Sequence, residues 1–445
     1  MKKYLSLLLV LSLSALHTGC VSPRQIMFSM GYMFNKPEAD YDALELAESG
    51  RVVTAHVDKE PYWIAYRGPK TNGIYEEQPI NLDWPKGGLQ AKWRFPIGAG
   101  FGSFVVAEGM AFTLEQRRGN EALVAYDLET GTQIWKHEYE GRFHEAMSGE
   151  GPRGTPTYHD GRVFSVGSMG TLCCVRAATG EPVWQRNVLT DAEAENLEYG
   201  LSASPVIVGN NVIALAGESK GSKTVRAYSI TDGSLAWSSL KDKQGYSTPQ
   251  RMTLAGQDQL VVCTGNRIAG LNPLNGEVLW TFDWQVLGGL ISSQPVQVDA
   301  DRFVVSGGYG KGTTLIEITR SGDRHTATEV WSSRRLNANF STPVVHKGFV
   351  YGLDGGILTC LNLADGKRVW KSGRFGFGQM LKVGNRLLIS AEKGDLLVVA
   401  LNPDALEVVS RFAAIEGKTL NNPALAHGFL LLRNSAERVC YDLNP

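Results

Sequence analysis

The sequence predicts an all-β protein, an eight-bladed β-propeller built of four-stranded antiparallel blades. Two observations predict this fold: a strand–turn–strand template that recurs along the chain, and a turn-rich composition of 50 Gly and 43% hydrophobic residues. The chain of 445 residues is too long for one ordinary hydrophobic core. It must therefore be several domains or one architecture that grows by repetition, and the repeat favours the second.

Seven segments share the template, in which an alternating strand ends near a small residue, a polar turn follows, and a second strand ends in Trp. The first copy reads ALVAYDLETGTQIW, and the last, LVVALNPDALEVVS, has Ser in place of Trp. The second strands end at Trp135, Trp184, Trp237, Trp280, Trp331, Trp370 and Ser410. These ends lie 39 to 53 residues apart, which suits one four-stranded propeller blade for each copy.

Two incomplete copies flank the seven. A strand of the Trp type, LQAKW, ends at Trp93, and a first half, RVCYDLNP, ends the chain. We expect the N-terminal strand to join three strands from about Ala413 onward, so that N- and C-terminal strands pair in one blade. Closing the ring in this way makes an eighth blade and removes exposed sheet edges.

The residue types at the template positions can be explained by the structure that each position requires. Gly in the turn, as at Gly131, supplies the positive φ that a tight hairpin needs. The small residue before the turn, held by Cys in the copies at Cys174, Cys360 and Cys440, is expected where adjacent sheets meet. The Trp rings are expected to stack between neighbouring blades.

The N-terminus predicts an export signal followed by a lipid-modified cysteine. Lys2 and Lys3 precede an apolar stretch over 5–16, which is typical of a signal peptide rather than of a spanning helix. The small pair before Cys20 resembles a bacterial lipobox, in which the cysteine becomes the lipidated N-terminus. The alternative is an ordinary secreted protein with an incidental Cys20. The residue after the cysteine is Val21 rather than Asp, and by resemblance to lipoprotein sorting this favours the outer over the inner membrane as the place of the anchored protein.

We therefore expect a signal peptide over 1–19, a lipid-anchored tether over 20–61 and the propeller over 62–445. The predicted location is the cell envelope, facing the periplasm. Lys+Arg total 44 and Asp+Glu total 45, without a block of like charge. Nucleic acid is consequently not an expected partner.

The first full copy, Ala125 to Trp135, matches the pattern A-x-D-x-x-T-G-x-x-x-W. The chain thus resembles the quinoprotein-like, or PQQ-binding-like, β-propeller repeat family. Within that family it is similar to the lipoprotein B subunit of the outer-membrane β-barrel assembly machine, over about 62–445. It is also similar to bacterial propellers that open with Trp-x-x-x-Arg-Gly-Pro, here Trp63 to Pro69. The resemblance implies a non-catalytic, membrane-tethered propeller that binds envelope proteins in cell-envelope or outer-membrane protein assembly.

The alternative is a PQQ-dependent oxidoreductase, which would need PQQ, Ca²⁺ with its oxygen ligands and a catalytic Asp. The pair Cys173-Cys174 resembles an adjacent-cysteine disulfide that covers the quinone in some such enzymes. Here the pair lies inside an alternating strand, which favours the core. The sequence has no Cys-x-x-Cys-His for covalent haem, and its 8 His show no metal-binding spacing. We therefore favour a protein without catalytic, cofactor-binding or metal-binding residues.

A candidate contact surface comes from positions three residues before the Pro that opens each innermost strand, or its equivalent. Equivalent positions of a closed propeller form a ring, so these residues are expected around one mouth of the central channel. Two of the eight are serines, Ser202 and Ser292. The other six, called the mouth ring below, are Phe101, Arg153, Tyr246, Phe340, Phe377 and Leu420. Such a ring suits a protein partner, a peptide or a flat cofactor. The alternative is that these side chains pack beneath the connecting loops.

Overall fold

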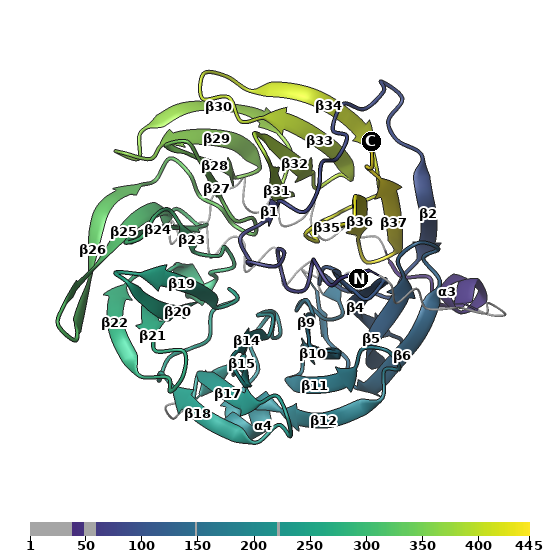
Figure 1. Ribbon diagram of the computed structural model, residues 1–445, viewed down its shortest axis with the longest axis horizontal. Coiled ribbons are helices and arrows are strands. Elements are labelled where there is room, and N and C mark those ends of the chain that lie inside the picture. The colour runs from purple at the N-terminus through teal and green to yellow at the C-terminus, as the bar shows by residue number, and fades with distance from the viewer. Residues whose placement is uncertain (1–37, 49–58, 147–148, 220–222) are drawn as a thin grey trace, which may run out of the picture.

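The computed structural model describes residues 38–48, 59–146, 149–219 and 223–445. Eight blades of four antiparallel strands stand around a central axis, which confirms the predicted eight-bladed propeller (Figure 1), and one blade gains a short parallel strand from the N-terminal segment. In seven blades the strands follow one another along the chain from the axis to the rim. The eighth blade takes its outermost strand from the N-terminal part of the chain.

The first four blades consist of the following strands. Blade 1 contains β3 (Val105–Ala107), β4 (Met110–Arg117), β5 (Asn120–Asp127) and β6 (Gln133–Glu140). Blade 2 contains β9 (Thr157–His159), β10 (Arg162–Val166), β11 (Thr171–Arg176) and β12 (Pro182–Asn187). Blade 3 contains β14 (Val206–Val208), β15 (Asn211–Leu215), β17 (Val225–Ser229) and β18 (Leu235–Ser239). Blade 4 contains β19 (Gln250–Leu254), β20 (Gln257–Cys263), β21 (Arg267–Leu271) and β22 (Val278–Asp283).

The remaining blades complete the ring. Blade 5 contains β23 (Val296–Gln297), β24 (Arg302–Gly307), β25 (Gly312–Ser321) and β26 (Arg324–Ser333). Blade 6 contains β27 (Val344–His346), β28 (Phe349–Asp354), β29 (Ile357–Asn362) and β30 (Arg368–Arg374). Blade 7 contains β31 (Gln379–Val383), β32 (Arg386–Ser390), β33 (Asp395–Ala400) and β34 (Glu407–Ala413). Blade 8 contains β35 (Ala424–Ala426), β36 (Phe429–Arg433), β37 (Glu437–Asp442) and β2 (Ala91–Pro96).

Short elements lie outside the blades. They are α3 (Tyr41–Glu48), β1 (Ile74–Tyr75), β7 (His144–Glu145), β8 (Gly149–Glu150), α4 (Val188–Ala192), β13 (Ala194–Glu195), β16 (Glu218–Ser219) and the 3₁₀ helix η1 (Leu287–Gly289). Within the described ranges, no helix is both long and apolar enough to cross a bilayer.

The closing blade has the predicted pairing of chain ends. β2 lies antiparallel to β37, with Trp93 opposite Cys440. The same register recurs in other blades, where Trp135 faces Ala125 and Trp370 faces Cys360. The small residue of the template therefore lies directly across the ladder from the Trp of its own blade.

The tryptophans join neighbouring blades, as predicted. The Trp135 indole Nε1–H donates to the Ala177 carbonyl of blade 2 at 2.8 Å. Its ring lies on the turn glycine of that blade, because a Cβ on Gly180 would come within 2.5 Å of it. Gly180 thus meets two demands at once, a φ of +73° and a flat surface for the ring. Trp93 and Trp331 make the same bond to Leu128 and Leu363, at 3.0 and 2.8 Å.

Ser410 stands where the last copy lacks Trp, and the structure gives the reason. The segment that leads to β2 passes between blades 7 and 8, and the Trp84 amide donates to the Ser410 hydroxyl at 3.2 Å. The Trp84 ring packs edge-on against Phe412, with centroids 5.3 Å apart. An indole from the N-terminal segment therefore fills the space beside this blade.

The same segment crosses the propeller axis (Figure 1). Trp63 forms an isolated bridge with Val106 of blade 1, and the Ile64 carbonyl accepts from the Tyr158 amide of blade 2 at 2.8 Å. β1 then runs parallel to β31 of blade 7. The stretch thereby connects the inner strands of blades 1, 2 and 7 across the axis.

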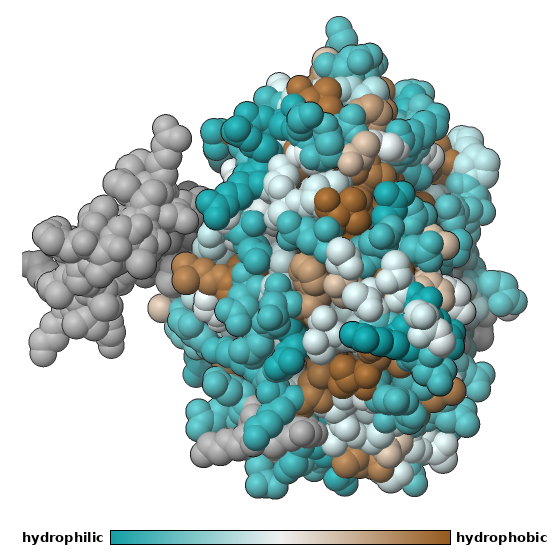
Figure 2. Space-filling model, turned by 90° about the vertical axis from the view of Figure 1, so that its left-hand side faces the viewer, coloured by the Kyte–Doolittle hydropathy of each residue, from teal (hydrophilic) through white to brown (hydrophobic). Residues whose placement is uncertain are grey.

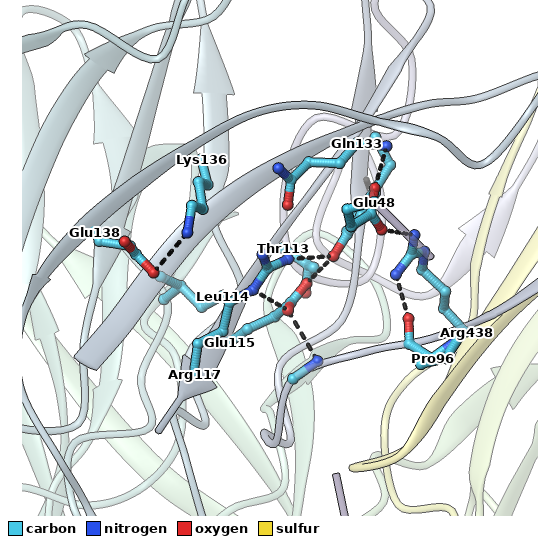
Figure 3. A network of polar contacts seen from close by, with 12 residues as sticks. Glu48, Pro96, Thr113, Leu114, Glu115, Arg117, Gln133, Lys136, Glu138 and Arg438 are labelled. Atoms are coloured by element: carbon cyan, nitrogen blue, oxygen red, sulfur yellow. Dashed lines mark hydrogen bonds and ion pairs between the residues drawn. The ribbon is translucent and has the colours of Figure 1, made fainter. Parts of the chain in front are cut away.

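α3 lies within the stretch 20–61 that we expected to be a tether, and it packs on the propeller where blades 8 and 1 meet. Figure 3 shows Glu48 between Gln133 of blade 1 and Arg438 of blade 8. Glu48 pairs with Arg438 at 2.5 Å and accepts the Gln133 amide at 3.0 Å. Leu44 is the helix's buried apolar side chain. Part of the expected tether thus belongs to the folded body.

Candidate functional site

The mouth-ring positions all lie just before an innermost strand. Phe101 precedes β3 and Phe377 precedes β31, and the other four mouth-ring residues precede the innermost strands of their blades in the same way, as do Ser202 and Ser292. All eight side chains, the two serines included, are half-buried. The ring therefore consists neither of freely exposed side chains nor of core residues.

Two residues deeper, each blade contributes a buried polar side chain. These eight residues, called the polar belt below, are Ser103, Thr155, Ser204, Thr248, Gln294, Thr342, Gln379 and Asn422, and none is more than 6% exposed. They link blade to blade: the Ser103 amide donates to the Thr155 hydroxyl at 2.8 Å, and the Thr155 amide donates to the Ser204 hydroxyl at 3.0 Å. In the sequence, six of these residues stand directly before a Pro, four of them as Ser or Thr, but the hydrogen bonds of the belt were not visible there.

On one side of the ring, aromatic side chains from blades 6 and 7 meet. The Phe340 and Phe377 rings form an edge-on pair with centroids 5.4 Å apart. Gln379 of the polar belt donates from Nε2 to the Phe340 and Leu420 carbonyls, both at 3.1 Å. Three mouth-ring positions are thus held together by direct contacts.

On another side, Arg153 lies over two aromatic rings. Its guanidinium carbon is 5.3 Å from the Phe101 centroid and 4.3 Å from that of Phe143, within the range of cation–π attraction. Arg153 also donates to the Gly149 carbonyl at 3.1 Å. Phe143 could not be found from the sequence, because it lies in the loop after β6 and does not correspond to any position of the repeat.

Tyr246 forms the third aromatic group. Its ring lies 5.9 Å from that of Tyr199, edge-on, and its carbonyl accepts the Ser202 hydroxyl at 3.0 Å. Burial raises the pKa of Tyr246 to about 12, so its hydroxyl is neutral at physiological pH. Tyr199 was also missed, since it too comes from an irregular connecting loop. The mouth ring and its neighbours therefore contain three groups of aromatic side chains, one of which includes the Arg153 cation.

The vicinal cysteines are core residues, as their strand position predicted. Cys173 and Cys174 are buried free thiols on β11, and they pack into different hydrophobic clusters. Burial raises the pKa of Cys174 to about 11, which keeps this thiol protonated. Cys20 lies outside the described residues.

Comparisons with known proteins agree with this architecture. A model of the family described as outer membrane protein assembly factor BamB matches residues 119–372. The protein of that name from Yersinia pestis is 26% identical over 296 residues, which cover 62% of this chain and 70% of the relative. The one from Bordetella pertussis is 18% identical over 309 residues, or 67% of this chain and 72% of the relative.

Among solved structures, BamB from Moraxella catarrhalis superposes with a TM-score of 0.56 at 16% identity, covering 79% of this chain and 97% of that one. Quinohemoprotein alcohol dehydrogenase from Comamonas testosteroni superposes with a TM-score of 0.61 at 13% identity, covering 90% and 84%. At such identities these likenesses concern the fold alone. The family match, in contrast, covers more than half of the sequence, and the chain belongs to the outer membrane protein assembly factor BamB family.

Proposed function

We propose that this protein is a non-catalytic, membrane-tethered scaffold that binds envelope proteins during outer-membrane protein assembly. The observation that carries the proposal is the family match over residues 119–372, since the family and both curated relatives are described as outer membrane protein assembly factors. The predicted lipidation of Cys20 would place the propeller at the periplasmic side of the outer membrane. The rest of 20–61 would then connect the anchor to α3 and the propeller.

The mouth ring is the proposed contact surface. Its aromatic side chains are half-buried, so each is held in place while part of its ring stays accessible. Aromatic and Arg side chains of this kind are frequent anchors of protein interfaces, because they bury a large area at a low cost in conformational entropy. Phe340 and Phe377 are two mouth-ring residues whose rings contact each other directly, and they are the first residues to change.

The test is capture of partners by cross-linking in envelope extracts, with the wild type compared with the double variant Phe340→Ala, Phe377→Ala. We expect the variant to capture less of the partners that the wild type enriches, because an anchor side chain can carry about 2 kcal/mol or more of binding. The matched control is Val369→Ala, Val408→Ala, which removes exposed apolar side chains from the outer strands of the same two blades. Figure 2 shows that, on the side of the propeller that it presents, apolar residues form small patches among hydrophilic ones.

Unfolding of both double variants is measured alongside. An unchanged set of captured proteins in a stably folded ring variant contradicts the ring as contact surface. A loss of about 3–5 kcal/mol for each Phe would instead mean that the side chains serve packing under the loops. The alternative function is tested on the same preparations by dye-linked oxidation of alcohols or sugars after addition of PQQ and Ca²⁺. Activity that depends on the quinone would replace the scaffold proposal.

A further inference from the structure

Arg67 is a fully buried cation near the propeller axis. It belongs to the N-terminal segment that crosses the ring (Figure 1), and it is 1% exposed. Its guanidinium donates to the Met380 carbonyl and to Asn422 Oδ1, both at 3.5 Å, and to the Asn72 carbonyl at 3.4 Å. Nε has no hydrogen-bond partner among the described residues. All three bonds are therefore long, and all go to uncharged oxygens.

Two other arginines are equally buried, and they show what Arg67 lacks. Arg438 pairs with Glu48 at 2.5 Å. Burial lowers the pKa of Arg433 to about 10, and the Glu115 carboxylate offsets part of this effect. For Arg67, the ionisable group of the described residues that acts on it is the Tyr66 phenol, and no carboxylate does so. Because a buried charge without a counterion is strongly unfavourable, Arg67 is the uncompensated member of this set.

The backbone conformation and the neighbouring residues hold the Arg67 side chain in a fixed position near the propeller axis. Arg67 itself has a φ of +64°, in the left-handed region that costs a non-glycine residue free energy. Gly73 lies against the guanidinium, since a Cβ there would come within 2.2 Å of Nη2. Asn422 belongs to the polar belt, and its Nδ2 donates to the Tyr66 hydroxyl at 2.8 Å, so its oxygen is left for Arg67. The guanidinium is thus fixed at the level of the belt, beneath the mouth ring.

We propose that Arg67 binds one compact anion at the propeller axis, either a halide ion or the carboxylate of a bound molecule. Arg67 has no counterion among the described residues, so one negative charge would compensate it. The group must be compact because Arg67 is almost completely enclosed. The Arg67 guanidinium supplies donors of fixed geometry, and Nε is the donor without a partner among the described residues. The proposal is independent of the scaffold function.

The direct test is crystallographic. Crystals of the wild-type protein are soaked in sodium bromide, and others in sodium formate. We expect an anomalous bromide peak within hydrogen-bond distance of the Arg67 guanidinium if the site takes a halide, and planar formate density there if it takes a carboxylate. Either outcome supports the site and identifies its chemistry. Absence of both ions from Arg67, with water or protein atoms in their place, overturns the proposal.

The solution test uses thermal unfolding at constant ionic strength, with bromide or formate exchanged for bulky isethionate. A ligand bound to the folded state alone raises its stability, and we expect the wild-type midpoint to rise by about 2 °C. Arg67→Met should abolish this dependence, while Arg368→Met, which removes an exposed arginine, should retain it. The same dependence in Arg67→Met contradicts the proposal. If Arg67→Met does not fold, the crystallographic result decides.

Discussion

The ion pair between Glu48 and Arg438 offers a sharp test of how α3 contributes to the closed ring. The Arg438 side chain is fully buried and that of Glu48 is 10% exposed. Glu48→Gln keeps the size and the acceptor for the Gln133 amide but removes the charge opposite Arg438. Breaking a buried pair by removing one partner costs about 3–5 kcal/mol. Arg438 keeps the Gly131 carbonyl at 3.1 Å and the Tyr126 ring at 3.7 Å, so we expect a loss of about 3 kcal/mol.

The assay is urea unfolding followed by Trp fluorescence, and the matched control is Glu45→Gln on the same helix. Glu45 pairs with Arg118 in solvent, where both side chains are more than half exposed, so this variant should unfold like the wild type. The deficit of Glu48→Gln should persist at about 1 M salt, because screening acts mainly on exposed charges. Equal midpoints for the two variants would refute the reasoning and show that α3 does not stabilise the seam.

Three further outcomes are expected. Trp135→Ala should lower the free energy of unfolding, measured with heat or urea, by about 3–5 kcal/mol. Trp135→Phe should lower it by only part of that amount, because Phe keeps most of the buried ring and loses only the hydrogen bond to Ala177. Equal losses in the two variants would show that the hydrogen bond dominates. Cys20→Ala should release the protein from membranes or block its processing, and a wild type found wholly in the soluble periplasmic fraction would contradict the anchor. Burial opposes the ionisation of Glu115, but Arg117 and the arginines of blade 8 outweigh it and hold its pKa below the usual range. Glu115 therefore stabilises the fold above pH of about 4.3, and the deficit of Glu115→Gln should shrink as pH falls through the folded pKa; a deficit independent of pH would contradict the assignment.

The blades were predictable because each copy of the repeat contains all the residues that specify its hairpin. The turn glycine, the small residue and Trp lie within one short stretch, so the pairing of Trp135 with Ala125 follows from the hairpin itself. The closing pair of Trp93 with Cys440 was predictable for the same reason, since the two incomplete copies match the two halves of one template. The mouth-ring positions could be located from equivalence alone, but their partners could not.

The contacts of the irregular segments were not predictable. Nothing in the sequence around Ser410 indicates that Trp84, which lies 326 residues away, fills the space beside blade 7. α3 has one buried apolar residue and does not belong to the repeat. Its Glu48 can form the buried ion pair only after the ring has brought Arg438 of blade 8 beside blade 1. Sequence reasoning therefore expected a tether over a stretch of which part is packed.

The sequence by itself thus determined the number, order and internal register of the blades, because these depend on interactions within about 50 residues of one repeat. The tertiary structure alone decided which side chains the ring encloses. Arg67 is charged, and charged residues usually lie at the surface, yet closure of eight blades places it near the axis, with Met380 and Asn422 as its neighbours. Burial of that kind arises only when segments far apart in the chain converge, and no local pattern encodes it.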